Sequence, residues 1–281
     1  MRITHGTDRG PRTNLEDQAA AIEMVNPTSG SAAAVLGVFD GVGGRTHGEV
    51  AAEIGRQHAL SAVAALATEL LVAGRTRAPD DVIDTMGGAL RAANSAVLKL
   101  AENDPSLRGM ATTAVCGLVY EGMLYTTWVG DSRCYVYGQR GLRQVTCDHS
   151  EAQELVDLGL YDSSEVHDLP IRHIITRFLG QQRGFAPETR VVRLSPGDLI
   201  LLCTDGMTDV LTDTEIENII EACQAKEDVA GQLIQRSLDN GARDNVTALC
   251  CDTDHEGVHL TDHTLTDLYT ERFAESLYHP I

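Results

Sequence analysis

The chain has 281 residues, of which 43% are hydrophobic, enough to bury one large core or two small ones. Its 41 acidic and 22 basic residues give a formal net charge of -19, so the basic surface that binds nucleic acid is missing. The first residues lack an apolar signal segment, and no stretch approaches the roughly 18 apolar residues of a membrane span. We therefore expect a cytoplasmic protein with no nucleic acid partner and no membrane partner.

The first half of the chain alternates between strand and helix signals. The apolar run at residues 31–39 is short and ends at Asp40, which favours a buried strand. Two long segments with apolar residues at helical spacing follow, at 48–74 and 78–103. Because a short loop joins them, they are predicted to form an antiparallel pair.

The second half contains more strands. Residues 111–120, 123–130 and 133–138 follow one another so closely that antiparallel hairpins are expected, rather than crossovers through a helix. The remaining predicted elements are a strand at 198–203, helices at 213–225 and 228–242, and a strand at 245–252. Strands grouped together with helices paired outside them predict an α+β fold, a central sandwich of two mostly antiparallel sheets flanked by antiparallel helix pairs.

No internal repeat or low-complexity linker divides the chain, so residues 1–252 are predicted to form one domain. Residues 253–281 are polar and acidic, and they are predicted to form a tail that ends in a short amphipathic helix. The seven cysteines form no CxxC pair, and most lie inside apolar runs. They are therefore interpreted as reduced core residues, not as zinc ligands or disulfides.

Acidic residues recur at the ends of the predicted strands. Asp40 is followed by Gly41, Gly43 and Gly44, and Asp205 is followed in the same way by Gly206. Each such dipeptide by itself is also an ordinary turn signal. If the strand ends converged, however, the carboxylates would repel one another unless a cation neutralised them. The companions of Asp40 and Asp205 are Glu16, Asp17, Asp131 and Asp244.

Seven short motifs occur in an order that resembles the metal-dependent serine/threonine protein phosphatases, the PPM or type 2C family. The resemblance runs from about Thr7 to Asp252, and the DGVGG form is similar to the bacterial branch. The motifs are R-x-x-x-E-D at 12–17, FDGVGG at 39–44, MATT at 110–113, GDSR at 130–133, DHS at 148–150, CTDGMTD at 203–209 and DN at 244–245.

The resemblance implies a role for each matching residue. Asp40 would bridge two Mn²⁺ or Mg²⁺ ions, with the Gly41 carbonyl on one ion and Asp205 and Asp244 on the other. Glu16 and Asp17 would act near that second ion through water. Arg12 would bind the substrate phosphate, and a third ion would be held by Asp131, Asp205 and Asp209.

The implied activity is hydrolysis of phosphoserine and phosphothreonine in proteins by a metal-activated water, opposing a bacterial serine/threonine kinase. A monomer is the family-based expectation. Leu15 and Ala111 depart from the usual family residues, whereas all the implied metal ligands are present. The alternatives are a catalytically weak, phosphoprotein-binding relative and a metal-dependent hydrolase of small phosphoesters.

Two histidines near the motifs could act as general acids, but structural roles are favoured for both. His47 is interpreted as a helix-start residue, and His149 as the start of a polar segment at 148–180. This segment resembles the flap that influences substrate choice in the family, and Thr176 and Arg177 are its candidates for reaching the site. The glycines at 41–48 lack the Lys-Ser/Thr of a nucleotide-binding P-loop.

Overall fold

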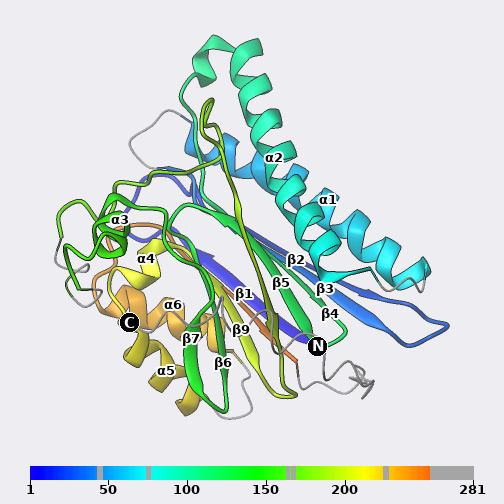
Figure 1. Ribbon diagram of the computed structural model, residues 1–281. Coiled ribbons are helices and arrows are strands. Elements are labelled where there is room, and N and C mark those ends of the chain that lie inside the picture. Colours follow the sequence, from blue (N-terminus) through cyan, green and yellow to red (C-terminus); the bar gives the residue numbers. More distant parts are fainter. Residues whose placement is uncertain (43–46, 74–76, 163–164, 166–168, 224–227, 254–281) are drawn as a thin grey trace.

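A computed structural model of the chain describes residues 1–42, 47–73, 77–162, 165, 169–223 and 228–253 (Figure 1). Two of the three glycines after Asp40, Gly43 and Gly44, lie outside the described residues. So do residues 254–281, and with them nearly all of the predicted tail.

The described residues form two five-stranded sheets in which all neighbouring strands are antiparallel. The first sheet has the order β1-β10-β9-β6-β7, with bounds Arg2–Asp8, Val246–Asp252, Leu199–Cys203, Arg133–Gly138 and Gly141–Gln144. The second has the order β2-β3-β4-β5-β8, with bounds Gln18–Val25, Ala32–Phe39, Ala114–Tyr120, Met123–Val129 and Glu188–Arg193.

Helices cover the outer face of each sheet (Figure 1). The long helices α1 and α2 pack together over the second sheet, and α5 and α6 pack on the first. The helix bounds are Gly48–Ala73 for α1, Pro79–Asn103 for α2, Glu151–Asp157 for α3, Asp205–Thr208 for α4, Asp213–Ala222 for α5 and Val229–Asp239 for α6, with a 3-10 turn at Pro105–Leu107. The predicted α+β sandwich is confirmed.

Strand β3 shows how the sequence builds these layers. Every residue from Ala32 to Phe39 is buried. Leu36 and Val38 point into the apolar layer between the two sheets, whereas Val35 and Phe39 point into the layer beneath α1 and α2. Successive side chains of a strand face opposite sides of the sheet, so a strand with sheet on one side and helices on the other must be apolar at every position.

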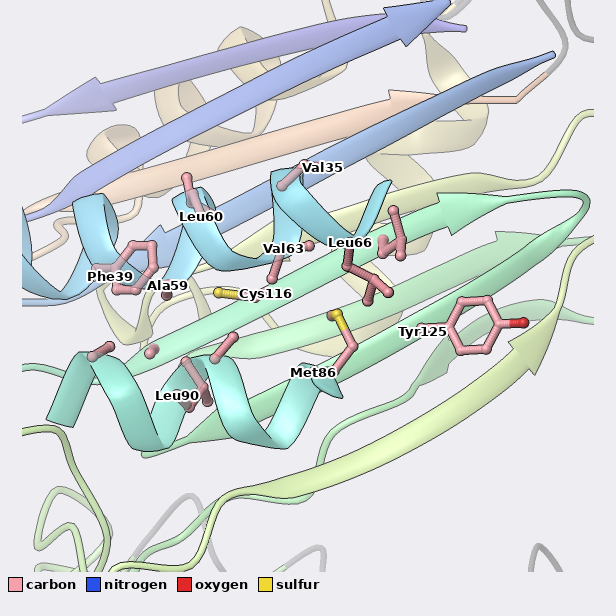
Figure 2. Close-up of a cluster of buried hydrophobic side chains, with 14 of the residues drawn as sticks. Val35, Phe39, Ala59, Leu60, Val63, Leu66, Met86, Leu90, Cys116 and Tyr125 are labelled. Atoms are coloured by element: carbon pink, nitrogen blue, oxygen red, sulfur yellow. The ribbon is translucent and has the colours of Figure 1, made fainter. Parts of the chain in front are cut away.

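Figure 2 shows the layer between the helices and the second sheet. Leu60, Val63 and Leu66 come from α1, and Met86 and Leu90 come from α2. These residues repeat at helical spacing, and they form the stripe that the sequence pattern predicted. A separate apolar cluster lies beneath α5 and α6, so the molecule has three apolar layers in all among the described residues.

The predicted hairpin between β4 and β5 is confirmed. Tyr120 pairs with Met123, and the two turn residues Glu121 and Gly122 have φ angles of 47° and 71°. Positive φ at both positions matches the twist of antiparallel strands.

The predicted hairpin between β5 and β6 is wrong. These strands belong to different sheets, and residues 130–132 carry the chain from one to the other. Gly130, with a φ of 99°, redirects the chain where a Cβ would collide with Thr113 at 2.6 Å. Closeness in sequence does not distinguish a hairpin from a strand pair that changes sheets, because both need only a short connection.

Four strands were missed: β1, β2, β7 and β8. They lie at the edges of the two sheets, and their residues are mostly half-buried or exposed, so they lack the continuous apolar run that marked the central strands. Among the helices in the described part of the chain, none has the length and apolar character needed to cross a bilayer.

Candidate metal centre

The strand pairing brings the acidic residues to one end of the sandwich. In the second sheet Gln18 pairs with Phe39, so Asp17 and Asp40 lie at neighbouring strand ends. In the first sheet β9 and β10 pair with Cys203 opposite Ala248, which places Asp205 and Asp244 beside each other beyond the paired residues. The short helices α3 and α4 lie at this end of the molecule, away from the N-terminus (Figure 1).

Asp131 reaches the same place from between the sheets. It lies in the 130–132 crossing, where it is 8% exposed. The neighbouring Ser132 hydroxyl lies 2.7 Å from the Thr113 hydroxyl, and Thr113 in turn accepts a hydrogen bond from the Asp40 N–H. The crossing that sequence reasoning took for a hairpin is therefore what positions this carboxylate.

A cavity of about 610 Å³ opens where these strand ends meet. It contains most of the predicted site residues, and it also receives side chains from residues 172–175, which the motifs did not assign. Its lining includes Arg12, Asp40, Asp131, Asp205, Asp209 and Asp244 from the prediction, together with Arg172, His173, Ile175 and Arg243.

Burial and mutual repulsion both raise the pKa values of the acids around the cavity, with burial the larger cause. Burial raises the pKa of Asp40 well above its ordinary value, and the carboxylates of Asp17, Asp205, Asp131 and Asp244 raise it further. Burial raises the pKa of Asp205 in the same way, with Asp131 as its strongest repelling neighbour. The acids therefore lie close enough to interact, with Asp40 facing Asp17, Asp205, Asp131 and Asp244.

Asp17 is the most deeply buried of these acids, 3% exposed. Its Oδ2 accepts hydrogen bonds from the hydroxyls of Thr247, at 2.6 Å, and Thr204, at 3.0 Å. Burial raises the pKa of Asp17 to about 6, although these two hydrogen bonds lower it. Thr204 lies inside the CTDGMTD motif and Thr247 lies two residues after Asn245, but neither hydroxyl gave a signal of its own in the sequence.

The pKa values of Asp131 and Glu16 are raised as well. Burial raises the pKa of Asp131 to about 7, and nearby Asp148 adds to the effect. The pKa of Glu16 is raised by burial and then by Glu49. An acid cluster of this kind favours its neutral form unless positive charge is supplied.

Arg12 lies at the edge of the cavity, where its guanidinium lies 2.5 Å from Asp244 Oδ2 and donates at 3.1 Å to the Arg243 carbonyl. The side chain is 44% exposed. Its segment is held by Asn245, whose Oδ1 accepts the Glu16 N–H at 2.7 Å and whose amide donates to the Asn14 carbonyl at 3.0 Å. The second residue of the DN motif thus positions the first motif of the chain.

Gly41 satisfies a steric requirement beside Asp40. A Cβ at this position would lie 2.5 Å from the Gly48 carbonyl carbon and 2.7 Å from the Glu16 carbonyl oxygen. These contacts are with backbone, which cannot rotate away as a side chain can. The glycine after Asp40 therefore allows the start of α1 and the Glu16 segment to approach the site.

His47 and His149 both have structural positions. His47 directly precedes α1, and its carbonyl accepts from the Val50 and Ala51 N–H groups, as the helix-start interpretation predicted. His149 is 5% exposed and stacks on Trp128. Its Nδ1 accepts the Gly130 N–H at 3.2 Å, and its Nε2 lies 3.2 Å from Glu188. His149 therefore supports the loop before Asp131.

The candidates Thr176 and Arg177 do not reach the cavity. Ile175 is the last residue of this segment that lines the cavity, and neither Thr176 nor Arg177 lines it. Arg177 instead donates to Glu188 at 2.9 Å. Arg172 and His173 lie there in their place. Their contacts are with Asp209, at 3.5 Å from Arg172 Nε to Oδ1 and 3.6 Å from His173 Nδ1 to Oδ2.

The donor set fits hard divalent cations. The converging groups offer carboxylate oxygens, which are the ligands preferred by Mg²⁺ and suited to Mn²⁺. Their raised pKa values show an excess of negative charge that bound cations would neutralise. Of the seven cysteines, all unpaired, five are buried and two are half-buried, and none lines the cavity among the described residues.

Comparison with known proteins gives a consistent result. The family model for protein phosphatase 2C matches residues 16–248. The serine/threonine phosphatase stp of Listeria monocytogenes is 30% identical over 255 residues, covering 90% of this chain and 96% of the Listeria protein.

Solved structures agree with this match. Serine/threonine phosphatase Stp1 from Staphylococcus aureus superposes with a TM-score of 0.76 at 31% identity, covering 89% of this chain and 94% of that one. The catalytic domain of the serine/threonine phosphatase PstP, solved with two manganese ions, has a TM-score of 0.72 at 31% identity and covers 89% and 97% of the two chains.

Proposed function

This chain belongs to the protein phosphatase 2C family and is a metal-dependent protein serine/threonine phosphatase, and we propose that it hydrolyses phosphoserine and phosphothreonine at a binuclear Mn²⁺ or Mg²⁺ centre. The observation that carries the proposal is the convergence of Asp40, Asp131, Asp205 and Asp244 around one cavity, with the buried Asp17 next to Asp40. The two manganese ions of the PstP structure support the number of ions.

The family resemblance supplies the residue roles, and the positions of the side chains are compatible with them. Asp40, directly after β3, would be shared by the two ions, and the Gly41 carbonyl would bind one of them. Asp205 and Asp244, which lie together beyond β9 and β10, would hold the other ion. Glu16 and Asp17 would act near that ion, where Asp17 accepts hydrogen bonds from Thr204 and Thr247. Asp131, Asp205 and Asp209 would hold a third ion.

When bound, the two ions lower the pKa of a coordinated water and neutralise charge on the phosphoryl group. The protein's own groups supply orientation. Arg12 lines the cavity with two guanidinium nitrogens fixed by Arg243 and Asp244, and its other N–H donors bind the phosphate oxygens. No cysteine nucleophile is needed. Burial raises the pKa of Cys203, the cysteine closest in sequence to the site, far from the range of a reactive thiolate.

We infer that the substrates are phosphoproteins, either a bacterial serine/threonine kinase or its targets, and that the enzyme acts on them as a monomer. The free cysteines suit the reducing cytoplasm. Residues 1–252 are proposed as the phosphatase domain and residues 253–281 as an acidic C-terminal tail.

The phosphoprotein-binding alternative is disfavoured because five of the implied metal ligands line the cavity, namely Asp40, Asp131, Asp205, Asp209 and Asp244. Of the two departures from the family residues, Leu15 is 42% exposed and Ala111 is fully buried. A hydrolase of small phosphoesters would use the same ions, and only substrate preference separates it from a protein phosphatase.

The first test is hydrolysis of a phosphothreonine peptide by metal-stripped protein, with Mn²⁺ or Mg²⁺ restored, beside Asp205→Asn. We expect turnover that requires metal and falls at least about 100-fold in the variant, since a group that stabilises developing charge contributes on that scale. Folded, metal-loaded protein without turnover would support the binding alternative. Equal turnover of p-nitrophenyl phosphate and the peptide would support the small-phosphoester alternative.

A further inference from the structure

His173 occupies a position that the family motifs do not assign. It lines the cavity, and its side chain is 47% exposed. The backbone around it is fixed to the body of the protein. The Ile174 carbonyl accepts the Glu151 N–H at 2.9 Å, and the Thr176 N–H donates to the His149 carbonyl at 2.8 Å. The imidazole is therefore presented to the cavity from an anchored segment.

The imidazole faces two carboxylates of α4 and the residue after it. One ring nitrogen of His173 and one oxygen each of Asp205 and Asp209 all lie within 4.8 Å of one another. Donor atoms around a single ion with bonds of about 2.1 Å lie about 3 to 4.2 Å apart. Small side-chain rotations would therefore bring these three donors around one ion.

The contact between His173 and Asp209 is too long to explain by itself why the imidazole faces these carboxylates. His173 Nδ1 lies 3.6 Å from Asp209 Oδ2, beyond the range of a good hydrogen bond. Asp209 also faces Arg172 at 3.5 Å, so it already has a permanent cation nearby. One oxygen each of Asp205 and Asp209 lie within 4.8 Å of each other, so a single cation would neutralise both carboxylates at once.

We propose that His173 is a nitrogen ligand of the third ion, beside Asp205 and Asp209, and that this ligand makes the site selective for Mn²⁺ and similar transition ions over Mg²⁺. The site shares Asp205 with the catalytic centre and so rests on the proposed function. Imidazole suits transition ions, whereas Mg²⁺ prefers oxygen donors, which is the basis of the selectivity. An ion bound to His173 and Asp205 would link residues 171–175 to α4 across the cavity.

The test is Mn²⁺ binding by the metal-stripped full chain, followed through the electron paramagnetic resonance signal of free Mn²⁺. We expect His173→Ala to weaken one class of Mn²⁺ sites at least about tenfold and to leave the tighter class unchanged. Mg²⁺ competition should then become more effective at the weakened class. His58→Ala is the matched control, because His58 is exposed on α1 and should bind Mn²⁺ like the wild type.

Two further variants separate a metal ligand from an ion pair. His173→Asp supplies an oxygen ligand and should recover much of the lost Mn²⁺ binding, whereas His173→Arg keeps a cation beside Asp209 and should not. Identical isotherms for the wild type and His173→Ala, or full binding by His173→Arg, would overturn the proposal. Circular dichroism checks folding. Continued metal-dependent peptide hydrolysis would show that the proposed function stands even if this site fails.

Discussion

Asn245 and Glu16 are joined by a 2.7 Å hydrogen bond from the Glu16 N–H to the Asn245 side-chain oxygen, across 229 residues of sequence. The same amide donates to the Arg9 and Asn14 carbonyls at 2.9 and 3.0 Å, and Asn245 is only 4% exposed. One buried side chain therefore positions the whole segment that carries Arg12 and Glu16.

Asn245→Ala should release that segment. We expect a stability loss of about 1–3 kcal/mol, because buried backbone groups lose their partners, together with a raised KM for phosphopeptide. Asn245→Asp keeps an acceptor for the Glu16 N–H but turns a buried carboxylate oxygen toward the Arg9 and Asn14 carbonyls. Since like partial charges then face each other, it should be at least as destabilised as Asn245→Ala in urea unfolding at neutral pH. An unchanged KM in the Ala variant would contradict the positioning role.

Asp40→Asn should separate stability from function. It removes one negative charge from a cluster in which burial and four neighbouring carboxylates raise the pKa of Asp40. The metal-free variant should therefore melt at a higher temperature than the metal-free wild type, while Mn²⁺ affinity and phosphatase activity are lost. Melting curves with and without Mn²⁺ test both effects. A lower melting temperature in the metal-free variant would show that the acids do not repel one another as described.

The metal-free protein should lose stability as the pH rises. Folding raises the pKa of Asp17 from 3.8 to about 6 and that of Asp131 from 3.8 to about 7. Between about pH 4 and pH 7 the folded state therefore holds more protons than the unfolded chain, so the free energy of unfolding falls as the pH rises through this window.

Urea unfolding at about pH 5.5 and pH 7.5 measures this effect. Folding lowers the pKa of some other groups, such as Glu188. These groups change the free energy of unfolding only at more acidic pH, because their stabilisation is lost as the pH falls below about 4.5. Saturating Mn²⁺ should reverse the trend, since metal binds the ionised carboxylates. Equal stability of the metal-free protein at the two pH values would contradict the raised pKa values.

Gly41→Ala and Gly88→Ala should have opposite effects. A Cβ at Gly41 collides with backbone of Gly48 and Glu16, so we expect a loss of about 1–3 kcal/mol and weaker Mn²⁺ binding. Gly88 lies inside α2 with no atom within 4 Å of an added Cβ, so Ala should stabilise the protein by up to about 1 kcal/mol. Thermal melting compares them, and similar effects in both variants would refute the steric role of Gly41.

Much of the fold could be predicted because its central strands are buried on both faces. Such strands are continuous apolar runs, and the long helices carry clear apolar stripes. The edge strands β1, β2, β7 and β8 bury less and were missed. The chain between β5 and β6 was misread because a three-residue connection is compatible both with a hairpin and with a change of sheet.

The amino-acid sequence by itself determined the chemistry, since the carboxylates and their neighbouring glycines are local features that recur at strand ends in a fixed order. The tertiary structure decided which groups surround them. It brought the Thr204 and Thr247 hydroxyls into hydrogen bonds with Asp17, and the Asn245 side chain into a hydrogen bond with the Glu16 N–H. It also placed His173 beside Asp209. Those contacts join residues far apart in the chain, so they depend on strand pairing and sheet packing, which no local pattern encodes.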